Sequence, residues 1–241
     1  MSEENKTPEV QGERRVKLTS MRKTIAKKML ENTHLAALSL SSYEIDATEL
    51  LKFRQELVEK EEEYEVRISV TDIFCKIIVE ALKQSPGLNA FITEDEMIYH
   101  DYINLAFAVA LPNGLITPVI KGAEKMSLVE IAKESKRLVE KAKNRKITMD
   151  DITGGTFSIS SMGPNSTGGV AMPLANYPQA GIVQFGAAIK KPVVIDDQIV
   201  IREMLRINMT YNHCVVDGAD VMKFNQVIKK LIADPRTLLK M

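Results

Sequence analysis

The sequence LRINMTYNHCVVDGAD, residues 205–220, contains the pattern on which the fold prediction rests. Its first half is an apolar, partly β-branched run that ends at Asn212 and predicts a β-strand. An Asp-Gly pair follows at 217–218 and precedes a segment with helical periodicity, in which Val221, Phe224 and Ile228 share one face. His213 therefore lies where a strand gives way to a helix, at an edge where rigid elements can support a functional side chain.

Helical and strand patterns are interleaved along the rest of the chain. Helices are expected after Ser20 as N-cap, with Met21 and Met29 on one face, and over 46–64, 69–87 and 126–145. Residues 69/72 and 127/130 stand at capping-box spacing. Strand patterns occupy 35–46, 88–93, 96–100, 102–120, 154–163, 180–189, 192–196 and 198–212, with turns expected at Asn113-Gly114 and Asp196-Asp197.

This order predicts a single α/β domain of the α+β type, with a mixed, largely antiparallel sheet. The apolar strands require helices over at least one face of that sheet. Residues 1–14 carry few large apolar groups and are expected to be a flexible N-terminal segment. Residues 15–241 would then form the folded domain.

Composition argues against several classes of protein. The 241 residues contain 32 basic and 32 acidic side chains, so net charge favours neither nucleic acid nor an anionic membrane. No apolar run is long enough to cross a bilayer, and the charged N-terminus lacks the apolar core of a signal peptide. A cytoplasmic protein with free thiols at Cys75 and Cys214 is expected. Its histidines and cysteines have no metal-ligand spacing, so no metal site is expected.

His213 is the candidate general base, because imidazole is suited to proton transfer near neutral pH. Structural roles compete with this: a histidine ending a strand is usually a satisfied hydrogen-bonding group, Asp217 suits a helix N-cap, and Ser160 and Ser161 could be plain strand hydroxyls. A dyad with Cys214 is disfavoured, since neighbouring strand residues point to opposite faces. No Gly-x-Ser-x-Gly elbow and no glycine-rich phosphate loop occurs.

Several ordered blocks resemble the catalytic domain of the dihydrolipoamide acyltransferases, the core components of 2-oxo acid dehydrogenase complexes. They are MRKTIAKKM, SPGLNAFI, NLAFAVALPNGLITPVI, the segment from LVEIAKESKR to FSISSMG, NYPQAGIVQFGAA and TYNHCVVDGAD, and they span the chain from about Arg14 to Pro235. The resemblance implies a two-layer sandwich similar to chloramphenicol acetyltransferase.

The last block carries the implied base. The family motif Asp-His-Arg-x-x-Asp-Gly is NHCVVDG here, so the base role falls on His213, while Asn212 and Cys214 replace the charged Asp and Arg. Asp217 is expected to order the turn that holds His213. In relatives an Asp at this position can pair with an Arg near the domain's start, for which Arg22 is the candidate.

The family's hydroxyl falls on Ser160 within FSISSMG, and Ser161 is the neighbour that could be mistaken for it. Ser160 would stabilise the oxyanion formed when one thiol attacks a thioester. Strand alternation allows only one of the two serines to face the site.

The resemblance also implies substrates and partners. Coenzyme A and a lipoyl group on a separate lipoyl domain would exchange the acyl group. The site would lie between subunits of a homotrimer, with His213 and Ser160 from different chains. Trimers could assemble further into a 24-mer or 60-mer core that binds decarboxylase and dihydrolipoamide dehydrogenase components.

Neither a lipoyl attachment motif nor a peripheral-subunit-binding domain is visible in the sequence. The chain is therefore expected to be an excised catalytic domain or a free-standing relative. Two alternatives remain open: a free-standing CoA-dependent acetyltransferase acting on a small hydroxyl or amine, and an inactive trimeric scaffold.

Overall fold

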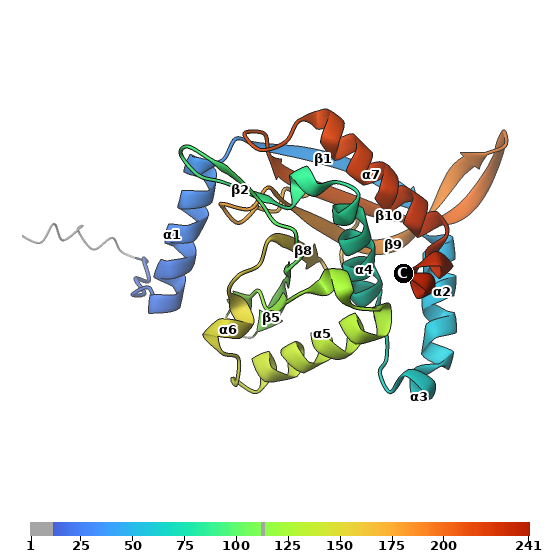
Figure 1. The fold of residues 1–241 in the computed structure, drawn as a ribbon, viewed down its shortest axis with the longest axis horizontal. Helices are drawn as coiled ribbons and strands as arrows, with labels where there is room; N and C mark the ends of the chain where they lie inside the picture. Colours follow the sequence, from blue (N-terminus) through green and yellow to red (C-terminus); the bar gives the residue numbers. More distant parts are fainter. Residues whose placement is uncertain (1–11, 112–113) are drawn as a thin grey trace, which may run out of the picture.

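A computed structural model describes residues 12–111 and 114–241. Helix α4 lies near the centre of the molecule, whereas α1 stands at one side and the β9–β10 hairpin projects from the other (Figure 1). The helices are α1 (Ser20–Leu35), α2 (Thr48–Glu59), α3 (Glu61–Tyr64), α4 (Val70–Lys83), α5 (Leu128–Lys143), α6 (Met149–Ile152) and α7 (Gly218–Ala233), with short 3-10 turns at Pro86–Leu88, Ala123–Lys125 and Pro235–Lys240. No helix in these described ranges has the length and apolar character needed to span a bilayer.

A six-stranded mixed sheet forms the centre of the fold, in the order β1-β10-β9-β8-β4-β7. β8 pairs in parallel with both β4 and β9, and the other pairings are antiparallel. These strands are β1 (Leu38–Asp46), β4 (Leu105–Phe107), β7 (Val119–Ile120), β8 (Phe157–Ser161), β9 (Gly181–Ile195) and β10 (Gln198–Asn212). Two small antiparallel hairpins join β2 (Ala90–Ile92) to β3 (Met97–Tyr99) and β5 (Val109–Leu111) to β6 (Gly114–Ile116). The expected mixed, largely antiparallel sheet is confirmed.

One face of the sheet carries the hydrophobic core. The ring of Phe74 on α4 stacks on that of Phe185 on β9, with centroids 4.0 Å apart and planes 10° from parallel. Phe224 on α7 packs against Phe157 on β8 at 5.9 Å. These contacts place α4 and α7 on the same face, as the periodicity of both segments predicts. Aromatic burial of this kind holds the helix layer to the sheet.

The opposite face is polar where the long strands meet. The Ser42 hydroxyl donates to Asn208 Oδ1 at 2.7 Å, and Asn208 Nδ2 lies 3.5 Å from Gln184 Oε1. Arg206 Nε donates to the carbonyl oxygen of Gly168, at 3.0 Å, so the loop after β8 crosses this face. The strand residues here are hydrogen-bonding groups, so this part of the face does not belong to the apolar core.

The capping-box predictions are confirmed for α4 and α5. Reciprocal capping boxes begin α4 and α5, at residues 69/72 and 127/130. The prediction for α1 was wrong by one residue: the Thr19 hydroxyl accepts from the Arg22 N–H at 3.2 Å, and Ser20 is already helical. Either hydroxyl could cap, and spacing alone did not choose between them. The expected apolar face of α1 is not buried in this chain, since Met21 is 48% exposed.

Further differences concern how elements are divided. Strand patterns 180–189 and 192–196 form one strand, β9, which tolerates Pro192 because β8 pairs only with its first part. The Asp196-Asp197 turn is confirmed, with both residues at positive φ. The expected helix 46–64 is divided into α2 and α3, and α6 was not predicted. The Asn113-Gly114 turn and most of the expected flexible segment 1–14 lie outside the described residues.

A fully buried lysine ties α4 to the end of the chain. Lys76 Nζ pairs with Glu80 Oε1 at 2.7 Å and donates to the backbone oxygens of Met126 and Met241 at 2.9 and 3.0 Å. Its side chain has 0% exposure, so each of these oxygens offsets the cost of removing the charge from water. Lys83 also contacts Glu80 Oε1, at 2.8 Å.

Lys76→Met is expected to lower the free energy of unfolding by about 3 kcal/mol, because it leaves the Glu80 carboxylate and two carbonyls without their buried partner. Urea unfolding at a fixed protein concentration measures this. Lys125→Met, at a side chain that is 85% exposed, is the matched control and is expected to change stability by less than about 0.5 kcal/mol. Equal stabilities of the two variants would contradict the structural role given to Lys76.

Candidate active site

The turn between β10 and α7 presents the candidate base. The His213 N–H donates to the Ala37 carbonyl at 2.8 Å, and the Asn212 carbonyl accepts from the N–H groups of Val215 and Val216 at 2.9 and 3.2 Å. These bonds shape the five residues between strand and helix and link them to the residue before β1. The backbone that carries His213 is therefore fixed from two directions.

The imidazole of His213 is accessible and faces a carboxylate. Its side chain is 44% exposed, and Nδ1 lies 3.6 Å from Asp217 Oδ1. This distance is longer than a hydrogen bond but within the range of an ion pair. The Tyr211 ring lies beside the imidazole, with centroids 5.3 Å apart. His213 can therefore exchange protons with a bound molecule while Asp217 influences its orientation.

Asp217 occupies the N-cap position of α7. Its N–H approaches Asp220 Oδ2 at 3.4 Å, and its carboxylate is 83% exposed. Asp217 is thus the N-cap residue of α7, as expected, and it also contacts His213. In the described part of the chain Arg22 forms no ion pair with Asp217, so the suggested pairing of these two residues is not found.

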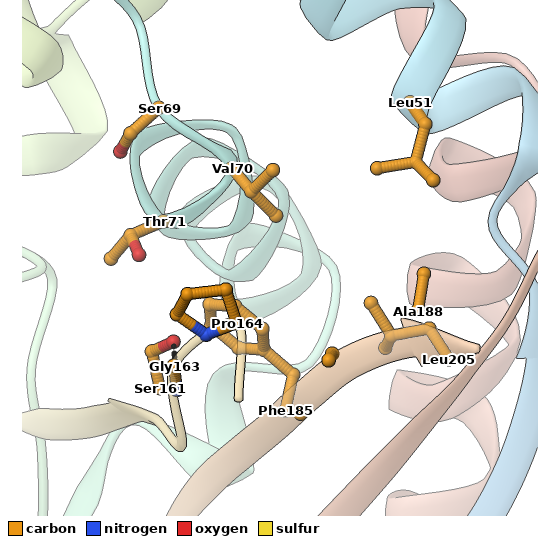
Figure 2. A pocket seen from close by; sticks show the side chains of 12 residues that line it. Leu51, Ser69, Val70, Thr71, Ser161, Gly163, Pro164, Phe185, Ala188 and Leu205 are labelled. Carbon is orange, nitrogen blue, oxygen red and sulfur yellow. Dashed lines mark hydrogen bonds between the residues drawn. The ribbon is translucent and has the colours of Figure 1, made fainter. Parts of the chain in front are cut away.

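Ser160 and Ser161 end β8 on opposite faces. Ser161 is paired in register with Phe185 on the core face, whereas Ser160 is paired with Gln184 on the polar face. The Ser161 hydroxyl accepts the Gly163 N–H at 3.2 Å (Figure 2). Within the described residues the Ser160 hydroxyl has no hydrogen-bond partner. Ser161 thus helps to shape the turn after β8, while Ser160 remains available to a bound group.

A largely apolar cavity of about 400 Å³ lies between α2, the start of α4 and the central strands. Figure 2 shows Leu51, Val70, Phe185 and Leu205 around it, with the hydroxyl-bearing residues of the α4 N-terminus at one side. Ser161 lines this cavity, and Ser160 does not. A second cavity of about 440 Å³ shares the α4 residues Ser69 and Thr71 and includes Arg67 and Lys136. The sequence did not indicate either cavity, because their walls come from segments far apart in the chain.

Sheet register separates Ser160 from His213 within one chain. Ser160 is aligned with Gln184, and Gln184 with Asn208, across two strand spacings, or about 10 Å. His213 lies five residues beyond Asn208, which adds about 17 Å along the strand. Their side chains cannot meet across this distance, so one chain holds the two candidate groups in separate places.

The two residues that flank His213 differ in their environment. Asn212 is completely buried, and its Oδ1 accepts the N–H groups of Ala37 and Cys214, each at 3.1 Å. Cys214 is an exposed free cysteine, and Cys75 is buried in α4. Sequence comparison with the motif identified the Asn but not its contacts, which depend on the distant start of β1.

The described residues contain no cluster of three His, Cys, Asp or Glu side chains that could hold a metal ion.

Comparison with known proteins covers nearly the whole chain. Residues 10–240 match the family described as 2-oxoacid dehydrogenases acyltransferase (catalytic domain). The chain is 36% identical over 228 residues to the dihydrolipoyllysine-residue succinyltransferase component of the 2-oxoglutarate dehydrogenase complex of Haemophilus influenzae. This alignment covers 94% of the chain but 56% of the relative, so the chain spans a little over half the length of that protein.

Solved structures agree with this family and fold. A structure of Azotobacter vinelandii dihydrolipoamide acetyltransferase, which concerns a serine, a histidine and an asparagine in its catalytic mechanism, has a TM-score of 0.89 at 29% identity and covers 97% of this chain and 98% of that one. The cubic core of the pyruvate dehydrogenase multienzyme complex has a TM-score of 0.88 at 29% identity, with the same coverage.

Chloramphenicol acetyltransferase, at 14% identity, has a TM-score of 0.53 and covers 86% of this chain and 94% of that one, which confirms the expected fold. The full-length family match and the shared architecture lead to one conclusion: the chain belongs to the acyltransferase family of the 2-oxoacid dehydrogenases and contains its catalytic domain.

Proposed function

We propose that residues 15–241 transfer an acyl group between coenzyme A and a dihydrolipoyl thiol, as a component of a 2-oxo acid dehydrogenase complex. The observation that carries this proposal is the accessible His213 imidazole, held at the end of β10 with Nδ1 facing Asp217. Family membership supplies the substrates: the relatives named above are a dihydrolipoyllysine succinyltransferase and a dihydrolipoamide acetyltransferase. Neither a small hydroxyl or amine acceptor nor an inactive scaffold is favoured by any specific observation.

The proposed reaction begins with proton transfer. A thiol with a pKa of about 8.5 is mostly protonated near neutral pH, although the thiolate is the nucleophile. With Nδ1 directed toward Asp217, Nε2 of His213 is free to take the S–H proton as the sulfur attacks the thioester carbonyl carbon. Collapse of the tetrahedral intermediate breaks the original C–S bond. The departing sulfur then recovers the proton from the imidazolium, so no acyl-enzyme forms.

Ser160 is the proposed donor to the oxyanion of this intermediate. Its hydroxyl has no internal partner in the described chain and lies on the polar face of the sheet. Ser161 already accepts the Gly163 N–H and faces the opposite side. Ser160 is therefore the serine that can donate a hydrogen bond without disturbing the turn after β8.

A second copy of the chain must complete the site. The sheet register places Ser160 and His213 too far apart within one chain, so each would act with its counterpart from a neighbour. We propose a homotrimer with three equivalent sites between subunits. The likeness to a cubic core supports further assembly of such trimers, with a lipoyl domain and the decarboxylase and dihydrolipoamide dehydrogenase components as partners.

The identity of the acyl group is a finer question, and the relatives differ on it. The Haemophilus influenzae relative is a succinyltransferase and the Azotobacter vinelandii relative an acetyltransferase. We propose succinyl transfer because the curated relative has the higher identity of the two. Parallel assays with succinyl-CoA and acetyl-CoA distinguish the two acyl groups.

Removal of the base tests the function directly. The wild-type protein is expected to form an acyl thioester from acyl-CoA and dihydrolipoamide, and His213→Ala is expected to lower kcat by about 10²–10⁴-fold, because no other group takes the thiol proton. Product formation by mass spectrometry measures both. Absence of any thioester product with the wild-type protein would refute the proposed activity, and full activity of His213→Ala would refute the base.

The two adjacent serines form a matched pair of variants. Ser160→Ala is expected to lower kcat by about 10²–10³-fold through loss of an oxyanion donor, with little change in KM. Ser161→Ala removes a hydroxyl of the same size from the other face and is expected to retain most of kcat. The reverse order of effects in the same thioester assay would assign the oxyanion role to Ser161.

Mixed assemblies test whether each site spans two chains. His213→Ala and Ser160→Ala are each expected to be nearly inactive alone, whereas purified mixed trimers should recover about a third of wild-type activity, because one of their three interfaces combines an intact serine with an intact histidine. The assay uses purified mixed assemblies carrying two different affinity tags. If both groups acted within one chain, no mixture of the two variants would recover activity.

A further inference from the structure

Asn212 is one of the two residues beside the base that depart from the family motif, and it takes part in several hydrogen bonds. It is the last residue of β10 and has 0% exposure. Its N–H donates to the Ala180 carbonyl at 2.8 Å, and its own carbonyl accepts from Val215 and Val216. The backbone of Asn212 thus joins the end of β10 to Ala180, just before β9, and to the turn that carries His213.

The side-chain oxygen of Asn212 adds a second connection. Oδ1 accepts the N–H of Ala37, before β1, and the N–H of Cys214, directly after the base. Two N–H donors fix which side of the amide faces them, since the NH₂ group could not accept either bond. The turn at His213 is therefore held on two sides: the Asn212 side chain accepts the N–H of Cys214, and the carbonyl of Ala37, just before β1, accepts the N–H of His213.

The other half of the amide has no such role. Asn212 Nδ2 is buried and has no hydrogen-bond partner among the described residues. A buried donor without a partner is destabilising, so the amide has a cost in stability at this position. An aspartate could accept the same two N–H bonds through one oxygen. It would also place a buried negative charge one residue before the base, in addition to the Asp217 carboxylate that contacts the imidazole. The amide leaves out that second charge.

We propose that Asn212 is a positioning residue of the active site: its amide oxygen holds the turn that presents His213, and its neutrality adds no second carboxylate to that of Asp217. Asp217 Oδ1 lies 3.6 Å from the imidazole Nδ1, and the Tyr211 ring lies beside the imidazole. A carboxylate at 212 would stabilise the imidazolium form and make His213 a base only at higher pH. The two N–H donors to Oδ1 would favour the ionised form of such a carboxylate. The inference rests on the proposed acyl transfer only for its kinetic readout.

Asn212→Asp tests the role of charge with two measurements. The acidic limb of the pH profile of kcat/KM for acyl transfer is expected to move upward by about 1 pH unit, with activity close to wild type at alkaline pH. The second measurement needs no substrate: diethyl pyrocarbonate reacts with unprotonated imidazole, and peptide mapping follows its modification of His213. The pH midpoint of that modification is expected to move upward by the same amount.

Controls separate charge from geometry. Asn225→Asp makes the same change at a half-buried position on α7 and is expected to leave both pH profiles unchanged. Asn212→Ala removes the acceptor and is expected to lower kcat at every pH, a loss that Asn212→Asp should rescue at alkaline pH.

Failure of this inference can be distinguished from failure of the proposed function. Unshifted pH midpoints in Asn212→Asp, or equal activities of the Ala and Asp variants at alkaline pH, would overturn the role of Asn212. A shifted modification midpoint in a protein that transfers no acyl group would uphold that role and refute only the acyl transfer.

Discussion

The register of three strands fixes how far Ser160 lies from His213, and most functional properties of the chain follow from that distance. Parallel pairing of β8 with β9 aligns Ser160 with Gln184, and antiparallel pairing of β9 with β10 continues the alignment to Asn208. A slip of one residue would move every side chain of a strand to the other face. The buried core on one side of the sheet therefore determines which hydroxyl the other side presents. Under the proposed mechanism, this distance means that a single chain cannot form a complete site.

The division between the two faces of the sheet explains how a rigid scaffold can also carry a polar site. Phe185 and Phe157 bind the helix layer through aromatic contacts with α4 and α7. On the other face Gln184, Asn208 and Ser42 interact with one another, which satisfies part of their hydrogen-bonding capacity without apolar cover. A face of this kind can meet a neighbouring subunit and solvent-borne substrates. Packing on the core face therefore keeps the sheet rigid, and the rigid sheet positions the hydrogen-bonding groups on the polar face.

Local sequence patterns predicted the helix starts and turns well, because caps and turns depend on residues that are close together in the chain. The capping boxes at Ser69 and Ser127 and the turn at Asp196-Asp197 depend on residues within a few positions of one another. The motif also identified His213 and Asp217 together, and the structure brings them within 3.6 Å. The cavity beside Leu51 and Phe185 was not predictable in the same way, since its walls are separated by more than a hundred residues. The contact of Asn212 with Ala37 was missed for the same reason.

The two departures from the family motif have a combined physical consequence. The motif has an acidic residue before the base and a basic residue after it, and this chain has Asn212 and Cys214, so one charge of each sign is absent. The net charge of the turn is unchanged by this pair of replacements. A carboxylate at the fully buried position 212 needs compensation, because an unpaired buried charge is costly. Without a cation at 214, a neutral acceptor satisfies both N–H groups and avoids that cost. At position 212 the turn that carries the base is thus held by hydrogen bonds to a neutral side chain, and the charged contact to His213 comes from Asp217.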